Sequence, residues 1–451
     1  MLDLTPPYLK CRRSEAQIEY TPEEYDYEEV ISSECNPFID QYLEAGNVNS
    51  SLLELEFLTH LDLSGIYFYQ SPIPMFIGSM QRLRYLSLSY ADFGGRIPSN
   101  LGNLTNLHFL DLSENDFLPD SNINWISQLP LLEHLDMSSN YYGFQVNIIN
   151  LTIGIPNLHF LSLANNGLSV SNLDALQNMT SLVHLDLGGN NLTSIPSWFG
   201  NFKKLEYLDL SWCYLHGPIP NAFQNATSIE ILDLSENNFD SLPSWFHKFK
   251  KLKHLLLSSN NFQGTIPVAL QNITSIESLD LYVNSFTSVP SWFIELKKLV
   301  YLNLSLNKLT SMKCSISSIL KSMCHLKWLY IAGNRLRQES IGNNDLSTCI
   351  RHDLENLDLS ENEFNDHLPS WLGQLENLGN LYLQDNFFYG PIPSSFGKLL
   401  KLKNLDLSNN KLEGDLPDFM GQLVNLMGVN LSNKEKYMEP TNNQPRMEQY
   451  N

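Results

Sequence analysis

The stretch Leu402-Lys-Asn-Leu405-Asp-Leu407-Ser-Asn-Asn410 decides the fold of this chain of 451 residues. Leu405 and Leu407 alternate with the polar residues Asn404 and Asp406. Alternation with a period of two is typical of a short strand that buries one face. The asparagine that ends the stretch can bond the backbone of a turn and of a neighbouring segment. The stretch therefore predicts a short strand followed by a turn with a buried amide.

The same pattern recurs through nearly the whole sequence. Sixteen residues, spaced by about 24.5 residues on average, open its short L-x-L segment: Leu61, Leu86, Leu110, Leu135, Leu161, Leu185, Leu208, Leu232, Leu255, Leu279, Leu302, Leu329, Leu357, Leu381, Leu405 and Val429. Asparagine stands five positions after twelve of these anchors, whereas Ile66, Ala91, Cys213 and Lys434 replace it in the other four repeats. A period between 20 and 29 residues is typical of leucine-rich repeats.

These repeats predict one elongated stack of coils. A single coil buries too few aliphatic side chains to offset its loss of chain entropy, so only stacking stabilises it. We expect an α/β leucine-rich repeat solenoid, a horseshoe or superhelix, with a parallel β-sheet on its concave face and a mostly irregular or 3-10 convex side. We expect an irregular acidic segment with a remnant repeat at 1–57, about 16 plant-type repeats at 58–433, and a polar, disordered tail at 434–451.

The second half of the coil resembles a plant subclass. Gly95–Gly102 and Asn386–Gly397 resemble the plant-specific repeat LxxNxLxGxIPxxLG. The segments at 49–55 and 415–426 resemble the ectodomains of plant leucine-rich repeat receptor-like proteins, such as the receptors for a fungal ethylene-inducing xylanase and related disease-resistance proteins. The resemblance implies a non-catalytic scaffold at the extracellular face of the plasma membrane, which recognises a protein or peptide ligand and signals through a partner receptor kinase in defence or development.

Other classes of function fit the sequence less well. The chain carries no signal peptide or membrane span and no cysteine-bearing cap, so we interpret it as an ectodomain fragment. Two alternatives stay open: a secreted inhibitor of a microbial enzyme, similar to the polygalacturonase-inhibiting proteins, and a truncated non-functional copy. The net charge of −21 argues against a nucleic-acid partner. No catalytic or nucleotide-binding motif occurs. We therefore expect no enzyme activity, no cofactor and no metal.

The residue before each anchor should point to the concave solvent. Aromatic and histidine side chains dominate this column between His60 and Trp328. We favour ligand contact over cross-strand packing for the aromatic side chains, because exposed aromatics are common anchors of binding surfaces. The expected ligand-contacting residues of the concave face are Tyr207, Trp212, Tyr282, Tyr301, Trp328, Tyr330 and Tyr382.

An acidic column follows the anchors. It comprises Asp62, Asp111, Asp136, Asp186, Asp209, Asp233, Asp280, Asp358 and Asp406. We expect it to be mostly a solvated ladder. The pairs His60–Asp62, His134–Asp136 and His184–Asp186 share a strand face, so acidification could protonate the histidines and strengthen these pairs, although simple surface histidines are the alternative.

Nine N-x-S/T sequons are candidate glycosylation sites if the chain is exported: Asn49, Asn103, Asn150, Asn178, Asn191, Asn225, Asn272, Asn303 and Asn430. Four of them, Asn103, Asn178, Asn225 and Asn272, lie seven residues before an anchor. A glycan on Asn303 or Asn430 would instead obstruct the concave face.

The cysteines suggest two disulfides. Cys324 and Cys349 lie about one coil apart, which brings them within disulfide reach, although Cys314 competes as a partner for Cys324. Cys11 and Cys35 could clip the acidic N-terminal segment. The spacing of apolar residues between 316 and 323 predicts a helix on the convex side. Tryptophans at 198, 245 and 292 repeat every 47 residues and should cover the convex core.

Overall fold

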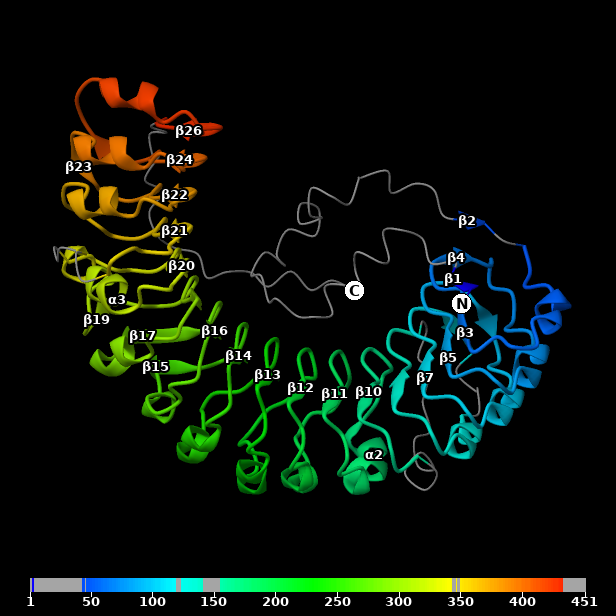
Figure 1. Cartoon of the computed structure of the whole chain (residues 1–451). Helices are drawn as coiled ribbons and strands as arrows, with labels where there is room; N and C mark the ends of the chain where they lie inside the picture. Colours follow the sequence, from blue (N-terminus) through cyan, green and yellow to red (C-terminus); the bar gives the residue numbers. More distant parts are fainter. Residues whose placement is uncertain are drawn as a thin grey trace, which may run out of the picture. The chain divides into compact units, whose positions relative to one another are not determined.

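The computed structural model describes residues 2–3, 43–44, 46–118, 123–140, 155–342, 346 and 349–432. The chain divides into two compact units, the first formed by residues 1–286 with 295–302, and the second by residues 287–294 with 303–451. Each unit is a run of coils in which a short strand is followed by a turn and then, in most coils, by a 3-10 helix (Figure 1).

The strands of the first unit form a parallel sheet. They follow one another in sequence order, and each anchor leucine pairs with the anchor of the next coil, as Leu61 does with Leu86. The strands are β1 (Leu2–Asp3), β3 (His60–Asp62), β5 (Tyr85–Ser87), β7 (Phe109–Asp111), β9 (His134–Asp136), β10 (Phe160–Ser162), β11 (His184–Asp186), β12 (Tyr207–Asp209), β13 (Ile231–Asp233), β14 (His254–Leu256) and β16 (Ser278–Asp280). Strand β1 pairs with β3 through Leu2 and Leu61, the register that a preceding repeat would have.

The second unit repeats this arrangement. Its strands β20 (Trp328–Tyr330), β21 (Asn356–Asp358), β22 (Asn380–Tyr382), β24 (Asn404–Asp406) and β26 (Gly428–Asn430) are also parallel and pair anchor to anchor. Strand β18 (Tyr301–Asn303) lies at the sequence boundary between the units. Shorter strands away from the main sheets are β2 (Leu43–Glu44), β4 (Ile66–Tyr67), β6 (Gly94–Gly95), β8 (Asp116–Phe117), β15 (Gln263–Thr265), β17 (Ser285–Val289), β19 (Ser311–Met312), β23 (Tyr389–Gly390) and β25 (Lys411–Leu412).

Short helices form the side of each coil opposite the strands (Figure 1). Proline precedes many of them, because its fixed φ suits the extended residue before a helix. The 3-10 helices are η1 (Ser50–Glu54), η2 (Met75–Ser79), η3 (Ser99–Asn103), η4 (Asn124–Gln128), η6 (Asp174–Asn178), η7 (Ser197–Asn201), η8 (Asn221–Asn225), η9 (Ser244–Lys248), η10 (Val268–Leu270), η11 (Ser291–Glu295), η12 (Gln338–Ser340), η13 (Ser370–Gln374), η14 (Ser394–Lys398) and η15 (Asp418–Gln422). Two α-helices, α2 (Val170–Leu173) and α3 (Ile316–Ser322), are added, and α3 confirms the predicted helix.

The core of each coil lies between the strand and the short helix. The anchor leucines are buried, and phenylalanines such as Phe199, Phe223 and Phe246 fill the helix side. Trp245 and Trp371 are buried against the helix side as well, whereas Trp198 and Trp292 are half-buried. The prediction that the repeated tryptophans cover this part of the core is therefore confirmed for Trp245 and only partly met at the other two positions. Among the described residues, no helix combines the length and the apolar character required to cross a membrane.

A ladder of buried asparagines joins successive coils. Asn237 Oδ1 accepts hydrogen bonds from the backbone N–H groups of Cys213 and Leu215 in the preceding coil. Its Nδ2 donates to the carbonyls of Leu210 and Leu234. One side chain thus satisfies backbone groups of two coils, which the interior would otherwise leave unpaired. The leucine and asparagine pattern therefore predicted the fold class correctly as a leucine-rich repeat solenoid with a parallel sheet.

Candidate ligand-binding face

The strand face of the first unit carries a continuous stack of aromatic rings. We define the strand face as the side chains that point away from the leucine core, on the first and third residues of each strand. Seven rings from successive strands, all half-buried, lie face to face in this order: His60, Tyr85, Phe109, His134, Phe160, His184 and Tyr207. Neighbouring centroids are 3.9–4.2 Å apart, and neighbouring planes are 7–15° from parallel.

The stack corrects the expectation that these rings avoid cross-strand packing. Parallel strands lie about 4.8 Å apart, so tilted flat rings at one position of every strand come into contact with both neighbours. The faces of the rings pack on each other, and only the ring edges remain for a ligand. Tyr207 ends the stack, because Ile231 occupies the same position on β13.

The acidic column is not a solvated ladder. Asp62, Asp111, Asp233 and Asp280 are buried, and the other members are half-buried. Every carboxylate accepts a hydrogen bond from the backbone N–H two residues later; the distances run from 2.7 to 3.0 Å. The aspartate therefore caps the turn that ends each strand, a local role that the sequence pattern did not reveal.

Burial changes the protonation of this column. It raises the pKa of Asp136 to about 7, and the nearby charge of Asp111 adds to the shift. It also raises the pKa of Asp186 to about 7, with Asp209 as the second cause. Burial raises the pKa of Asp280 to about 6. Carboxylates stacked at the strand spacing repel one another, so part of the column binds protons near neutral pH.

One histidine of the strand face, His184, does not behave as the pairing hypothesis predicts. Burial, and then the charge of His134, lowers the pKa of His184 to about 3. A ring held between Phe160 and Tyr207 has little water to stabilise its cationic form. Acidification to pH 5 therefore leaves His184 neutral, and the proposed strengthening of a His184–Asp186 ion pair is wrong.

Aromatic side chains are exposed at the edge where the strands end. Trp212 is 63% exposed and Tyr214 is 66% exposed, both in the turn after β12. We call them, with Tyr90 and Val283 of other coils of the first unit, the turn edge. All four are among the more exposed apolar side chains of the described residues. Sequence reasoning found Trp212 but missed Tyr214, which lies outside the strand columns.

The backbone at the turn edge adopts a left-handed conformation. The φ angles are 53° at Trp212, 55° at Tyr214 and 49° at Val283. The position of Trp212 and Val283, four residues after the anchor, has a positive φ in other coils as well, at Gly189 and Asn165 but also at Glu114 and Leu306. A bulky or β-branched residue in this region costs on the order of 1–2 kcal/mol. The repeat imposes the conformation, since the N–H of Trp212 donates to the carbonyl of Ser235 in the next coil at 3.1 Å.

The other predicted ligand residues differ in how far their side chains are exposed. Tyr301 is only 6% exposed, and its hydroxyl donates to the Asp280 carboxylate, so the expectation that it faces solvent is wrong. Tyr207 and Tyr282 are half-buried on the first unit. In the second unit, Trp328, Tyr330 and Tyr382 are likewise half-buried on their strands. The Lys327 ammonium lies 5.4 Å from the ring centroid of Trp328, within cation–π range.

Amides replace aromatic rings on the second unit. Asn380 donates to Asn356, and Asn404 Nδ2 donates to Asn380 Oδ1 over 2.8 Å. These three residues occupy the same position of their strands as the stacked rings of the first unit. At this position the first unit therefore carries seven stacked rings, whereas the second unit has Trp328 followed by a ladder of three amides.

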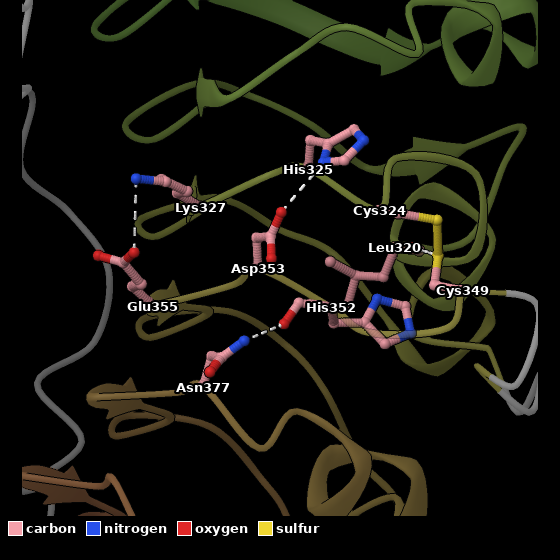
Figure 2. Close-up of polar contacts among 9 residues, drawn as sticks. All are labelled: Leu320, Cys324, His325, Lys327, Cys349, His352, Asp353, Glu355 and Asn377. Carbon is pink, nitrogen blue, oxygen red and sulfur yellow. Dashed lines mark hydrogen bonds and ion pairs between the residues drawn. A yellow bond between two sulfur atoms is a disulfide. The ribbon is translucent and has the colours of Figure 1, made fainter.

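A disulfide joins two coils of the second unit, as predicted. Figure 2 shows Cys324 bonded to Cys349. A hydrogen bond between His325 and Asp353 (3.0 Å) and an ion pair between Lys327 and Glu355 (3.6 Å) connect the same coils. Cys314, the competing partner, is a buried free thiol. Cys11 and Cys35 lie outside the described residues.

No metal site is evident in the described parts of the chain. No three histidine, cysteine, aspartate or glutamate side chains gather there in a way that could hold an ion.

Comparison with known proteins agrees with this geometry. Residues 197–387 match the family model "Leucine-rich repeat region", and residues 156–215 match "Leucine rich repeat". Receptor-like protein EIX1 of Solanum lycopersicum is 38% identical over 182 residues, which are 39% of this chain and 17% of EIX1. Receptor-like protein EIX2 of the same plant is 35% identical over 220 residues, which are 37% of this chain and 22% of EIX2. The relatives that this chain resembles over these segments are plant receptor-like proteins. The chain spans about a fifth of the length of these relatives.

Solved structures of plant receptors share the fold. The ectodomain of the Arabidopsis thaliana receptor kinase GASSHO1/SCHENGEN3, in complex with CASPARIAN STRIP INTEGRITY FACTOR 2, has a TM-score of 0.62 and is 25% identical over 86% of this chain and 55% of that one. The Arabidopsis receptor kinase HAESA, in complex with an N-terminally extended IDA peptide hormone, has a TM-score of 0.53 and is 26% identical over 83% of this chain and 70% of that one.

Proposed function

We propose that this chain is ectodomain material of an exported, glycosylated, membrane-attached plant receptor. It recognises a protein or peptide ligand in defence or developmental signalling, acts without catalysis, and works with a partner receptor kinase. Relatives named receptor-like proteins support this role, as do similar folds solved with peptide ligands.

The exposure of two aromatic side chains supports ligand binding at particular residues. Trp212 and Tyr214 are the most exposed aromatic side chains near the strand face of the first unit, and both lie on left-handed backbone. Aromatic side chains on a rigid support lose little entropy on binding and are frequent hot spots of interfaces. The stacked rings end at Tyr207 of the same coil, so a ligand that contacts Trp212 and Tyr214 can also reach the ring edges.

A binding experiment tests the proposal. The purified chain is immobilised. The probes are a purified fungal endo-xylanase and the two peptides of the similar solved structures, CASPARIAN STRIP INTEGRITY FACTOR 2 and IDA. We expect binding to at least one probe, with the double variant Trp212→Ala, Tyr214→Ala at least tenfold weaker, an effect typical of hot-spot truncation. Tyr69→Ala is the matched control, since Tyr69 is 53% exposed and also has a positive φ but lies outside the turn edge. Binding that the double variant retains in full would exclude the turn edge, and no binding to any probe would contradict the proposal.

A further inference from the structure

Six exposed lysines lie in one row of the first unit, at the edge of the sheet where the strands begin. They form pairs in the turns after η7, η9 and η11, four and five residues before the anchors of alternate coils: Lys203, Lys204, Lys250, Lys251, Lys297 and Lys298. We call these six residues the lysine ridge. Neighbouring parallel strands are about 4.8 Å apart, so the stacking of coils places successive pairs roughly 10 Å apart.

The first lysine of two pairs reaches the coil in between. Lys203 Nζ donates to the carbonyl of Asn225 at 3.3 Å, and Lys250 Nζ donates to the carbonyl of Asn272 at 2.8 Å. Asn225 ends η8, and Asn272 follows η10, so both acceptors belong to coils without a lysine pair of their own. A cationic nitrogen is therefore present on consecutive coils from η7 to η11, at about the strand spacing of 4.8 Å.

Among the described residues, none of the six lysines forms an ion pair with a carboxylate. The intervening turns offer hydroxyls instead, and Thr227 and Thr274 are exposed at the positions that Lys203 and Lys250 hold in their coils. Like charges in a row repel one another, so the ridge does not stabilise the fold. At physiological ionic strength, charges more than about 8 Å away are largely screened, so an anion at the ridge meets these cations rather than the net charge of the whole chain.

Glutamates border the ridge on the side of the strands. Glu206, Glu230 and Glu277 stand immediately before β12, β13 and β16. Lys253, in the same column, pairs with Glu230 at 2.7 Å. A carboxylate accepts hydrogen bonds but repels an anion. A ligand that covers the ridge and its border must therefore carry both anionic groups and hydrogen-bond donors.

A linear acidic polysaccharide has both kinds of group. Each sugar of a polyuronate carries one carboxylate and several hydroxyls, and one sugar spans about the distance between two neighbouring strands. An extended acidic peptide presents the side chains of one face about 6.6 Å apart, which fits the coil spacing less well. The hydroxyls of the sugar can donate to the bordering glutamates and accept from the exposed threonines.

We propose that the lysine ridge binds a linear acidic polysaccharide, with the carboxylates of successive sugars on the lysine ammonium groups. The ridge lies where the strands begin, whereas the turn edge lies where they end. The inference thus goes beyond the proposed function and does not depend on it, because the polysaccharide leaves the turn edge open for a ligand.

Two candidate glycosylation sites, Asn225 and Asn272, border the ridge, and both side chains are exposed. A sugar attached to either would lie beside the lysines, so binding is measured on a chain secreted from a eukaryotic host behind a supplied leader. Of the remaining sequons, Asn303 is half-buried, Asn150 lies outside the described residues, and five are exposed: Asn49, Asn103, Asn178, Asn191 and Asn430.

Binding of polygalacturonate tests the proposal. The probe is an oligomer long enough to cover the five coils from η7 to η11, and its methyl ester, which keeps the hydroxyls and loses the charge, is the matched neutral probe. The ridge variant combines Lys204→Gln, Lys251→Gln and Lys298→Gln. The control variant makes the same change of charge at three exposed lysines of the second unit, Lys308→Gln, Lys313→Gln and Lys398→Gln.

We expect the parent chain to bind polygalacturonate more weakly as the salt concentration rises, and the ester at least tenfold more weakly than the acid. The ridge variant should bind the acid at least tenfold more weakly than the parent, whereas the control variant should stay within about twofold. Thermal unfolding of both variants checks that the fold is retained.

Several outcomes would overturn the proposal. These are no binding of polygalacturonate by the secreted chain, equal binding of acid and ester, and equal losses in the ridge and control variants. Poly-L-glutamate of similar length should bind at least tenfold more weakly, and equal binding would assign the ridge to an acidic peptide instead. The double variant Trp212→Ala, Tyr214→Ala should bind polygalacturonate as the parent does, so failure at the ridge and failure of the proposed function are distinguishable.

Discussion

The imidazole of His184 stacks on the phenol ring of Tyr207, with centroids 3.9 Å apart and planes 7° from parallel. This contact ends the aromatic stack of the first unit. The turn that follows Tyr207 carries Trp212 and Tyr214, the exposed aromatics of the turn edge. The same coil therefore carries one ring that packs within the stack, Tyr207, and two exposed rings that a ligand can contact, Trp212 and Tyr214.

Replacing a ring within the stack should destabilise the first unit. Phe160 lies between His134 and His184, and each aromatic pair contributes about 0.5–1.5 kcal/mol beyond area burial. We expect Phe160→Leu to cost about 1–3 kcal/mol and Tyr207→Leu about half as much, measured by denaturant unfolding. Ile231→Leu, at the next position of the column, should cost less than about 0.5 kcal/mol. Equal costs at Phe160 and Tyr207 would argue against a stack with additive pairs.

The buried aspartates should make the chain more stable as the pH falls. Asp136 and Asp186 have pKa values of about 7 in the fold, against about 3.9 in an unfolded chain. Between these values the folded chain binds more protons, so the free energy of unfolding rises from pH 7.5 to pH 4.5, on the order of 2 kcal/mol. His184, with its lowered pKa of about 3, opposes this trend, but the carboxyls outnumber it.

Removing the two carboxyls should flatten this dependence. Asp136→Asn with Asp186→Asn keeps a hydrogen-bond acceptor for the turn and removes the titration. The variant should be more stable than the parent at pH 7.5 and similar to it at pH 4.5, in denaturant midpoints taken across this range. Asp415→Asn, at an exposed site, should leave the slope unchanged. A parent chain that loses stability steadily below pH 7 would show that the carboxylates are better solvated than described.

One substitution in the asparagine ladder should raise the stability of the fold. Cys213 occupies the position of the buried asparagine in its coil. Its thiol donates a hydrogen bond to the Leu187 carbonyl, with 3.2 Å between Sγ and the oxygen. Cys213→Asn supplies the amide that the neighbouring coils have and should raise stability by about 1 kcal/mol. The reciprocal change Asn237→Cys should lower it by about 2–4 kcal/mol, because two backbone N–H groups lose their acceptor. Thermal unfolding of both variants measures these changes in stability. Destabilisation by Cys213→Asn would mean that this coil has no room for an amide.

Reducing the disulfide should affect the second unit. The bond between Cys324 and Cys349 closes a loop with a sequence separation of 25, which corresponds to roughly 3–4 kcal/mol in the chain-entropy account. Cys324→Ser with Cys349→Ser should increase limited proteolysis around α3, and a reductant should then have no further effect. Cys314→Ala, which removes a free thiol, should keep the parent's response to the reductant. Unchanged proteolysis in the double variant would show that the polar contacts of His325 and Lys327 suffice to hold the two coils together.

The sequence by itself determined the repeat, the strand positions and the asparagine ladder, and it favoured the pairing of Cys324 with Cys349 while leaving Cys314 open as a partner. These features depend on the period and the spacing of residues, which recur in successive coils. Only the tertiary structure decided the environment of the strand face. A period of two shows that Tyr207, Tyr301 and Asp209 leave the leucine core, but it does not show what lies beside them. Stacking the coils brings equivalent side chains within about 5 Å of each other. That proximity turns an aromatic column into a ring stack, buries Tyr301 on Asp280, and raises the pKa of aspartates expected in water.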